Sequence, residues 1–168
     1  MAMIGKHINA KGYTLSEMLM VVAIMGILAS VAAPLLVRVT NFWRQTTARN
    51  EIERDVRASL DIINRFLRQA DRRTVLLGQV SGQPPYSRVS FITEKGQSVV
   101  FYQQGNKLYM SLDGVSSMLS ERVGYIAFTY PRTDDTSIVS VAVTMQAPTY
   151  LGGRKALQLS ISKVRIMN

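Results

Sequence analysis

The stretch that decides the fold is Lys11-Gly12-Tyr13-Thr14-Leu15-Ser16-Glu17, followed directly by residues 18–37, which carry no charged side chain. A helix of about 20 apolar residues spans roughly 30 Å, the thickness of the hydrocarbon core of a bilayer. Residues 18–37 are therefore predicted to form a membrane-spanning helix. Basic residues lie on both sides of this segment, so charge alone does not set its orientation.

Glu17 is the unusual feature of this segment, because it stands at the start of the apolar run. An ionised carboxylate costs up to about 2.5–3.5 kcal/mol at the centre of a membrane unless a partner stabilises it. The position of Glu17 therefore predicts a pairing with a cation.

The stretch resembles the processing site of type IV pilins and of the pseudopilins of type II secretion. In that family a prepilin peptidase cuts after the glycine and methylates the new amino terminus. The resemblance implies cleavage between Gly12 and Tyr13 and methylation of the Tyr13 amine. The family's glutamate at the fifth mature position corresponds to Glu17, and Pro34 falls where many members have a helix-kinking proline. The new amine would neutralise Glu17 during assembly, whereas the uncut chain would leave this carboxylate unpartnered.

The fold class that the resemblance implies is α+β and pilin-like, with a long N-terminal helix, membrane-spanning in its first half, packed on an antiparallel β-sheet head. The expected segments are a leader peptide over residues 1–12, a transmembrane half-helix over 13–37, an amphipathic half-helix over 38–73 and a β-rich head over 74–168. The resemblance also implies a single-pass protein of the inner membrane with its head on the periplasmic or extracellular side.

Two ordinary alternatives exist for the apolar segment, namely a secretory signal peptide and an uncleaved anchor. Residues 29–33 are Ala-Ser-Val-Ala-Ala, which offer the small side chains that signal peptidase prefers. Against a signal peptide, the preceding region would be long and would end in Glu17 instead of a cation, and Pro34 would crowd the cut. The prepilin interpretation is favoured, and a secreted domain is its alternative.

The composition argues against an enzyme, a cofactor and a metal centre. The chain has no cysteine, which excludes disulfides, thiolate metal sites and cysteine nucleophiles. Its single histidine, His7, lies in the expected leader, so the mature chain would have no imidazole for acid–base chemistry. Asp113, Asp134 and Asp135 offer oxygen ligands for calcium, but aspartates in such short connections are more typical of turns.

The net charge is +9, and removal of residues 1–12 with Lys6 and Lys11 leaves +7. Such an excess suits an anionic lipid surface or a nucleic acid. The basic residues are spread without a run of five, which favours a solvated helix face beside the membrane. Gly152-Gly153-Arg154-Lys155 lacks the context of a phosphate loop and predicts a hairpin. Six tyrosines are expected to pack on the sheet instead of stacking on bases: Tyr86, Tyr102, Tyr109, Tyr125, Tyr130 and Tyr150.

Beyond the membrane segment, apolar residues recur at spacings of three and four, which predicts an amphipathic helix that continues to about Arg72. The apolar stripe consists of Ile52, Val56, Leu60, Ile63, Leu67 and Ala70. Because proline removes one backbone hydrogen bond and clashes with the preceding turn, a kink or a locally melted turn is expected near residues 29–34.

Residues 77–87 predict a loop, and after them the apolar period changes from 3.6 to 2. Short connections such as Asp113-Gly114 favour antiparallel pairing. The alternation shifts between Ile161 and Val164, which predicts a bulge near Ser162 and Lys163. Six strands are expected around Val89 and Phe91; Val99 and Phe101; Leu108, Met110 and Leu112; Ile126, Phe128 and Tyr130; Val139, Val141, Val143 and Met145; and Leu157, Leu159 and Ile161.

These features predict a structural subunit, a minor pilin or pseudopilin that is processed by prepilin peptidase and joins a type IV pilus or a type II secretion pseudopilus. The expected partners are the peptidase, other pilin or pseudopilin subunits and inner-membrane lipid. The alternative is a pilus-tip module that binds DNA or a surface. The missing cysteines depart from pilins whose carboxyl-terminal loop is closed by a disulfide, which argues against an adhesin-type head.

Overall fold

The structure is a computed structural model that describes residues 12–149 and 156–167. The chain divides between Phe42 and Trp43 into two compact units. Most of the expected leader, with His7, and the expected hairpin at Gly152-Gly153-Arg154-Lys155 lie outside the described residues.

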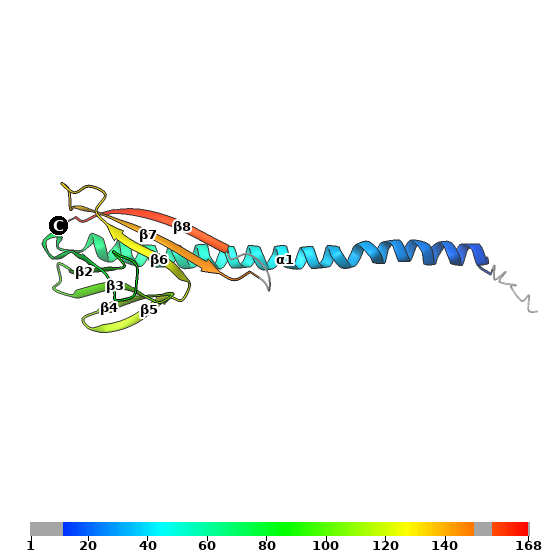
Figure 1. The fold of residues 1–168 in the computed structure, drawn as a ribbon, viewed down its shortest axis with the longest axis horizontal. Coiled ribbons are helices and arrows are strands. Elements are labelled where there is room, and N and C mark those ends of the chain that lie inside the picture. The colour runs from blue at the N-terminus through cyan, green and yellow to red at the C-terminus, as the bar shows by residue number, and fades with distance from the viewer. Residues whose placement is uncertain (1–11, 150–155, 168) are drawn as a thin grey trace, which may run out of the picture. The chain divides into compact units, whose positions relative to one another are not determined.

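One long helix, α1 (Leu15–Arg68), begins in the first unit and ends in the second (Figure 1). Pro34 lies inside this helix, and the helical assignment passes through residues 29–34 without a break, so the expected melted turn is absent there. Proline has no N–H, so Pro34 cannot donate to the carbonyl of Ser30. One turn earlier, the Ser30 hydroxyl donates to the Ile27 carbonyl at 2.7 Å.

The helix ends at Arg68, four residues before the predicted position near Arg72. The backbone after Arg68 bonds to the end of β2 and the residue after it. Ala70 forms a β-bridge with Thr93, and the Asp71 N–H donates to the Ile92 carbonyl at 2.9 Å. A short 3₁₀ helix, η1 (Arg72–Thr74), follows, with the Asp71 carboxylate accepting from the Arg73 N–H. The predicted end was wrong because these tertiary hydrogen bonds compete with the last helical turn.

The first sheet is an antiparallel meander in which each strand pairs with the next along the chain. Its strands are β1 (Leu76–Gly78), β2 (Arg88–Ile92), β3 (Ser98–Gln104), β4 (Lys107–Leu112) and β5 (Val115–Ser120). A two-residue turn, Asp113-Gly114, joins β4 to β5, and both residues have positive φ, as a type I′ hairpin turn requires. The sequence pattern does not predict β1, which is too short to show a period, or β5, whose apolar residues do not alternate.

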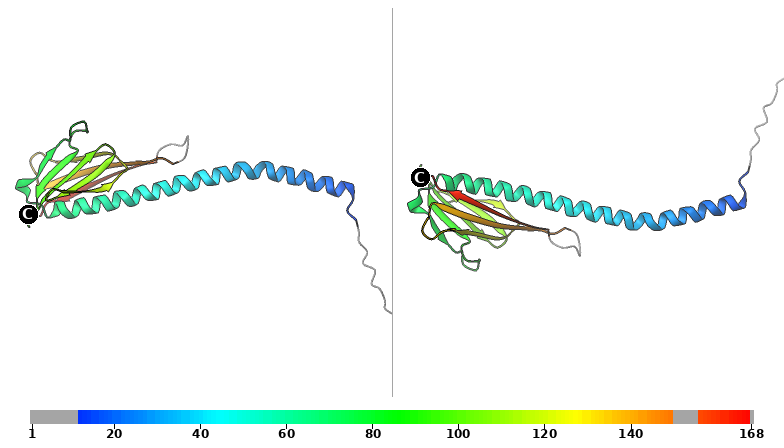
Figure 2. Two further views of the ribbon diagram at one scale, coloured as in Figure 1. Left: turned by 90° about the horizontal axis from the view of Figure 1, so that it is seen from below. Right: turned by 90° about the horizontal axis from the view of Figure 1, so that it is seen from above.

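The second sheet contains β6 (Val123–Thr129), β7 (Ile138–Ala147) and β8 (Ala156–Arg165), also antiparallel in chain order. The ten-residue register of β7 with β8 is unbroken, so the bulge predicted near Ser162 and Lys163 is wrong. The head therefore has two sheets in place of the single predicted sheet. In Figure 2, both views show the sheets on the same side of the carboxyl-terminal part of α1.

The core forms between the predicted helix stripe and the inward faces of both sheets. Ile63 and Leu67 are fully buried, and Phe66 of the helix packs edge-on against Phe101 of β3. Full burial of such an aliphatic side chain contributes about 1.5–3 kcal/mol. Arg122, just before β6, adds ion pairs to Glu51 and Asp55 of the helix at 2.9 and 3.0 Å.

Candidate functional site

The candidate site lies at the start of α1, where Thr14 and Glu17 form a reciprocal capping box. The Thr14 N–H and the Thr14 hydroxyl each donate to the Glu17 carboxylate at 2.8 Å, and the Glu17 N–H points back to the Thr14 hydroxyl oxygen at 3.3 Å. The first helical bond follows at once, from the Met18 N–H to the Thr14 carbonyl. The box satisfies backbone donors that a helix otherwise leaves without partners, which explains why the helix starts here.

The capping box gives Glu17 partners that were not expected. The uncut chain was expected to offer its carboxylate no cation, and two hydrogen-bond donors from Thr14 bind it. The spacing Thr-x-x-Glu before an apolar run is a known sign of a capping box, so the sequence held the signal that was missed. Thr14 supplies hydrogen bonds and no positive charge, and no cation pairs with Glu17 among the residues that the structure describes.

Gly12 and Tyr13 precede the helix and are both exposed. A Cβ atom added at Gly12 would meet no atom of the described chain within 4 Å, its two chain neighbours left aside. Tyr13 and Glu17 line one shallow depression together with Met18, Met20 and Val21. The peptide bond between Gly12 and Tyr13 is thus open to another molecule, and the Tyr13 backbone lies near the Glu17 carboxylate.

No described residue buries the apolar side chains of the segment after Glu17. Its large side chains are all exposed, among them Leu19, Leu28 and Leu36. α1 is long and apolar enough to cross a membrane by its length and composition. Such an exposed apolar surface is stable when lipid or other apolar helices surround it.

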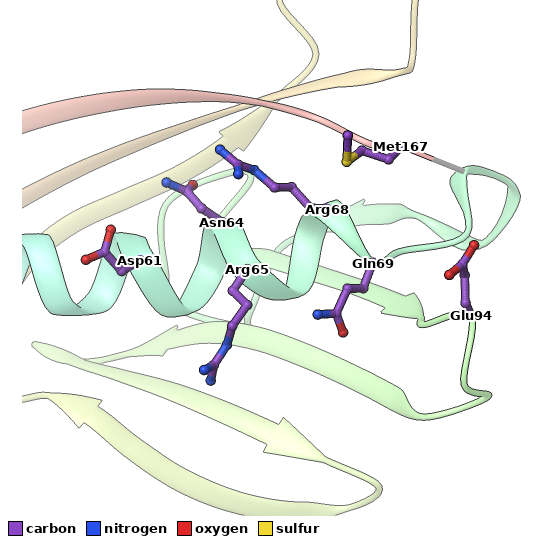
Figure 3. Close-up of a pocket in the computed structure, with 7 residues that line it drawn as sticks. All are labelled: Asp61, Asn64, Arg65, Arg68, Gln69, Glu94 and Met167. Atoms are coloured by element: carbon purple, nitrogen blue, oxygen red, sulfur yellow. The ribbon is translucent and has the colours of Figure 1, made fainter.

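A second hollow lies at the carboxyl end of α1, lined by Asp61, Asn64, Arg65, Arg68, Gln69, Glu94 and Met167 (Figure 3). Its charged groups do not converge on one point. Arg65 projects toward the first sheet, whereas Arg68 lies on the side of Met167, and Glu94 stands apart in the loop after β2 (Figure 3). This open hollow holds no arrangement of acid, base and nucleophile within reach of one another.

The three aspartates considered as calcium ligands form turns. Asp113 has a positive φ and accepts from the Ser98 N–H at 2.8 Å, and Asp134 pairs with Arg132 at 3.7 Å. Among the described residues, no three His, Asp or Glu side chains lie together as a metal site would need.

Asp135 lies in the loop between β6 and β7 and accepts hydrogen bonds from Ser137. Hydrogen bonds from the Ser137 hydroxyl and N–H, with Arg72 and Arg165 nearby, hold the pKa of Asp135 below its ordinary value. The carboxylate also pairs with Arg72, just after the helix, at 3.7 Å. Asp135 therefore ties the loop between β6 and β7 to η1.

The described tyrosines confirm the packing interpretation at three positions. Tyr102 and Tyr109 are direct partners on β3 and β4, and their rings stack at 5.4 Å. The Tyr130 hydroxyl donates to the Val75 carbonyl at 3.3 Å, and burial raises the pKa of this phenol. Tyr150 lies outside the described residues.

Comparison with known families finds one match, the prokaryotic N-terminal methylation motif, over residues 8–33. The match covers Gly12, Tyr13, the capping box and most of the apolar segment. No curated protein and no solved structure matches the chain.

Proposed function

We propose, from the prokaryotic N-terminal methylation motif at residues 8–33, a signature of type IV pilins and pseudopilins, that this chain is the precursor of a structural subunit of a membrane-rooted filament. Prepilin peptidase removes residues 1–12 and methylates Tyr13, and the mature chain joins other pilin or pseudopilin subunits. The observation that carries the proposal is that the motif coincides with an exposed peptide bond directly before a capped apolar helix.

Cleavage is supported by the surroundings of Gly12. A protease must take the backbone in an extended form close to its catalytic groups, and a bulky side chain at the cut would obstruct this approach. Because a Cβ atom at Gly12 meets no atom of the described chain beyond its chain neighbours, substitution of Gly12 should act mainly on the peptidase. The helix and its capping box begin after the cut and stay intact.

Assembly is supported by the charge left on Glu17. Cleavage produces an amine on Tyr13, and this cation can neutralise the carboxylate within one subunit or between neighbours. Low surrounding dielectric strengthens the attraction and raises the cost of a mismatch. The pairing would couple maturation to incorporation into the filament.

The proposed segments are the leader over residues 1–12, the transmembrane half-helix over 13–37, the amphipathic half-helix over 38–73 and the head over 74–168. In this proposal the apolar half contacts inner-membrane lipid and then neighbouring helices, and Pro34 kinks it. The head lies on the periplasmic or extracellular side, and the subunit has no enzymatic activity.

Intact-mass measurement of the membrane-extracted protein tests the processing step. The mature chain should lack residues 1–12 and carry one added methyl group on Tyr13. Gly12→Leu should accumulate as uncut precursor that is still membrane-bound, since its apolar helix is unchanged. A mature chain that begins near Ala33 or Pro34 would instead establish an ordinary signal peptide.

Co-purification with partner subunits tests the assembly step. Glu17→Ala should be cleaved and inserted normally but should recover few partner subunits, and Glu17→Asp should be intermediate because its shorter side chain reaches less far. Undiminished recovery with Glu17→Ala would contradict the role of Glu17 while leaving the processing step intact.

A further inference from the structure

The three-stranded sheet has two edges, and the described structure closes only one of them. At the β6 edge, the Val123 and Phe128 N–H groups each donate at 2.9 Å, to the carbonyls of Asn106 and Tyr86. The Ile126 N–H donates to the Gln103 side chain at 3.0 Å. The first sheet and its loops therefore accept three N–H groups of β6. β8 pairs with β7 on one side, and no strand of the described residues lies on its other side (Figure 1).

The backbone direction of β8 follows from its register. The Ile166 N–H donates to the Ser137 carbonyl at 2.8 Å, so residue 166 directs its polar groups toward β7. Backbone direction alternates along a strand, and the register is unbroken. The N–H and C=O groups of residues 157, 159, 161, 163 and 165 therefore point to the open edge.

The same residues also carry their side chains on the outward face. Leu157, Leu159 and Ile161 are 65%, 61% and 60% exposed, although the sequence predicted them to be half buried. The alternate residues face the core, where Val164 is buried and the Ser162 hydroxyl lies 3.3 Å from the Asn64 side chain of α1. The open edge and the apolar row thus belong to one set of residues.

Along β8, only the carboxyl-terminal charges of Lys163 and Arg165 are of the kind that shields an edge strand. Natural proteins also shield edge strands by keeping them short, by bulges or by proline. β8 is ten residues long, has no proline and pairs in unbroken register. The free edge strands of the first sheet are much shorter: β1 has three residues and β5 has six.

The charge along β8 indicates which kind of strand can bind at its open edge. Its outward row ends in Lys163 and Arg165, both exposed, and the strand contains no acidic residue. Arg165 lies near Asp135, which is already paired with Arg72, while no ion pair within 4.0 Å involves Lys163 among the described residues. A second copy of β8 would bring two further cations and no acid.

We infer that β8 is a docking edge that accepts an extended segment of a different polypeptide by strand addition. The segment carries apolar side chains at alternate positions, which cover Leu157, Leu159 and Ile161, and acidic side chains beside Lys163 and Arg165. Its backbone extends the sheet by a fourth strand, since main-chain bonds supply affinity and the side-chain row supplies specificity. This inference stands on the head alone and does not depend on the proposed processing.

Fluorescence anisotropy with two synthetic peptides tests the inference on the full chain in lipid nanodiscs. One labelled peptide alternates Val and Thr and ends in two Glu placed to lie beside Lys163 and Arg165. The other is identical except that Lys replaces both Glu. The acidic peptide should bind at least about tenfold more tightly, because like charges placed opposite each other on neighbouring strands are destabilising.

Ile161→Pro should weaken binding of the acidic peptide by about tenfold or more, because proline removes an N–H at the open edge and none of the bonds to β7. Unchanged head melting would show that the fold persists. Lys163→Glu, which leaves the backbone intact, should largely abolish the preference between the peptides, because Arg165 stays and each peptide then meets one like and one opposite charge. Lys95→Glu, an exposed charge in the turn after β2, is the matched control and should leave the preference unchanged.

Equal binding of the two peptides, or unchanged affinity in Ile161→Pro and unchanged preference in Lys163→Glu, would overturn the inference. Concentration-dependent self-association that Ile161→Pro abolishes would also overturn it, because the edge would then belong to a second copy.

Discussion

The two parts of α1 divide their apolar residues differently. Before Phe42, apolar side chains surround the helix and are exposed, whereas after Trp43 they form one stripe that the head buries. Ile27 is 66% exposed and Ile63 is 0% exposed, although both are isoleucines of the same helix. The comparison teaches that one continuous helix can present two different apolar patterns, and that each pattern needs a different partner for its burial.

The pattern around the helix decides which partner each part can use. A stripe matches the flat face of a sheet, and its polar opposite face stays in water. A helix that is apolar all round has no face for water, so it suits lipid or several surrounding helices. The first part of α1 therefore has its stabilising partner outside this chain.

The largest expected difference comes from the same substitution in the two parts. Ile63→Ala should lower the free energy of unfolding of the head by about 2–5 kcal/mol, because it leaves a cavity in the core. Ile27→Ala should leave this free energy unchanged, because no atom of the head depends on it. Urea denaturation followed by near-UV circular dichroism in nanodiscs measures both, and equal losses would contradict the comparison.

A smaller effect is expected at the capping box. Thr14→Ala removes the hydroxyl that binds Glu17 and should destabilise the first helical turn by about 1 kcal/mol. Faster hydrogen–deuterium exchange of the first-turn amides should report this loss, with no change in head unfolding. Ser16→Ala is the control, because the Ser16 hydroxyl contacts only the Thr14 hydroxyl at 3.1 Å in the described chain. Equal exchange in both variants would show that the box does not hold the helix start.

The smallest effect is expected at Asp135 and depends on pH. Its pKa is lowered in the folded chain from an ordinary value near 3.8, so its ionised form stabilises the fold above that pH. This contribution should be lost as the pH falls through the lowered pKa. Asp135→Asn should therefore melt slightly below the unmodified chain at pH 7, and the two melting temperatures should converge in acid.

Asp134→Asn serves as the control for the pH experiment. The Asp134 carboxylate contacts the exposed Arg132 at 3.7 Å, and such surface pairs contribute little. A difference at Asp135 that persists unchanged to low pH would show that the carboxylate charge is not the cause.

Several elements could be predicted from the sequence because their cause is local. The stripe from Ile52 to Ala70 has the helical period, and all six of its residues are buried as predicted. Asp113-Gly114 forms the expected turn, since glycine and aspartate tolerate the positive φ that a tight hairpin needs. The Thr14–Glu17 box is equally local, and the spacing Thr-x-x-Glu before an apolar run was enough to predict it.

The end of α1 could not be predicted in this way. Ala70 continues the apolar stripe, so periodicity extends the helix through it. The bridge from Ala70 to Thr93 ends the helix earlier, and that partner lies far along the chain. A periodic pattern predicts which residues are buried. It does not predict which backbone groups elsewhere in the chain form hydrogen bonds with them.

The sequence by itself determined the apolar span, the amphipathic stripe, the central strands and the processing motif, because each follows from the order of neighbouring residues. Only the tertiary structure decided that the strands form two sheets and that Leu157, Leu159 and Ile161 face outward. An alternating row is the same whether it faces the core or the solvent, and a shift of one residue exchanges the faces. In β8 the pairing with β7 settles the choice by placing Val164 in the core and the apolar row at the open edge.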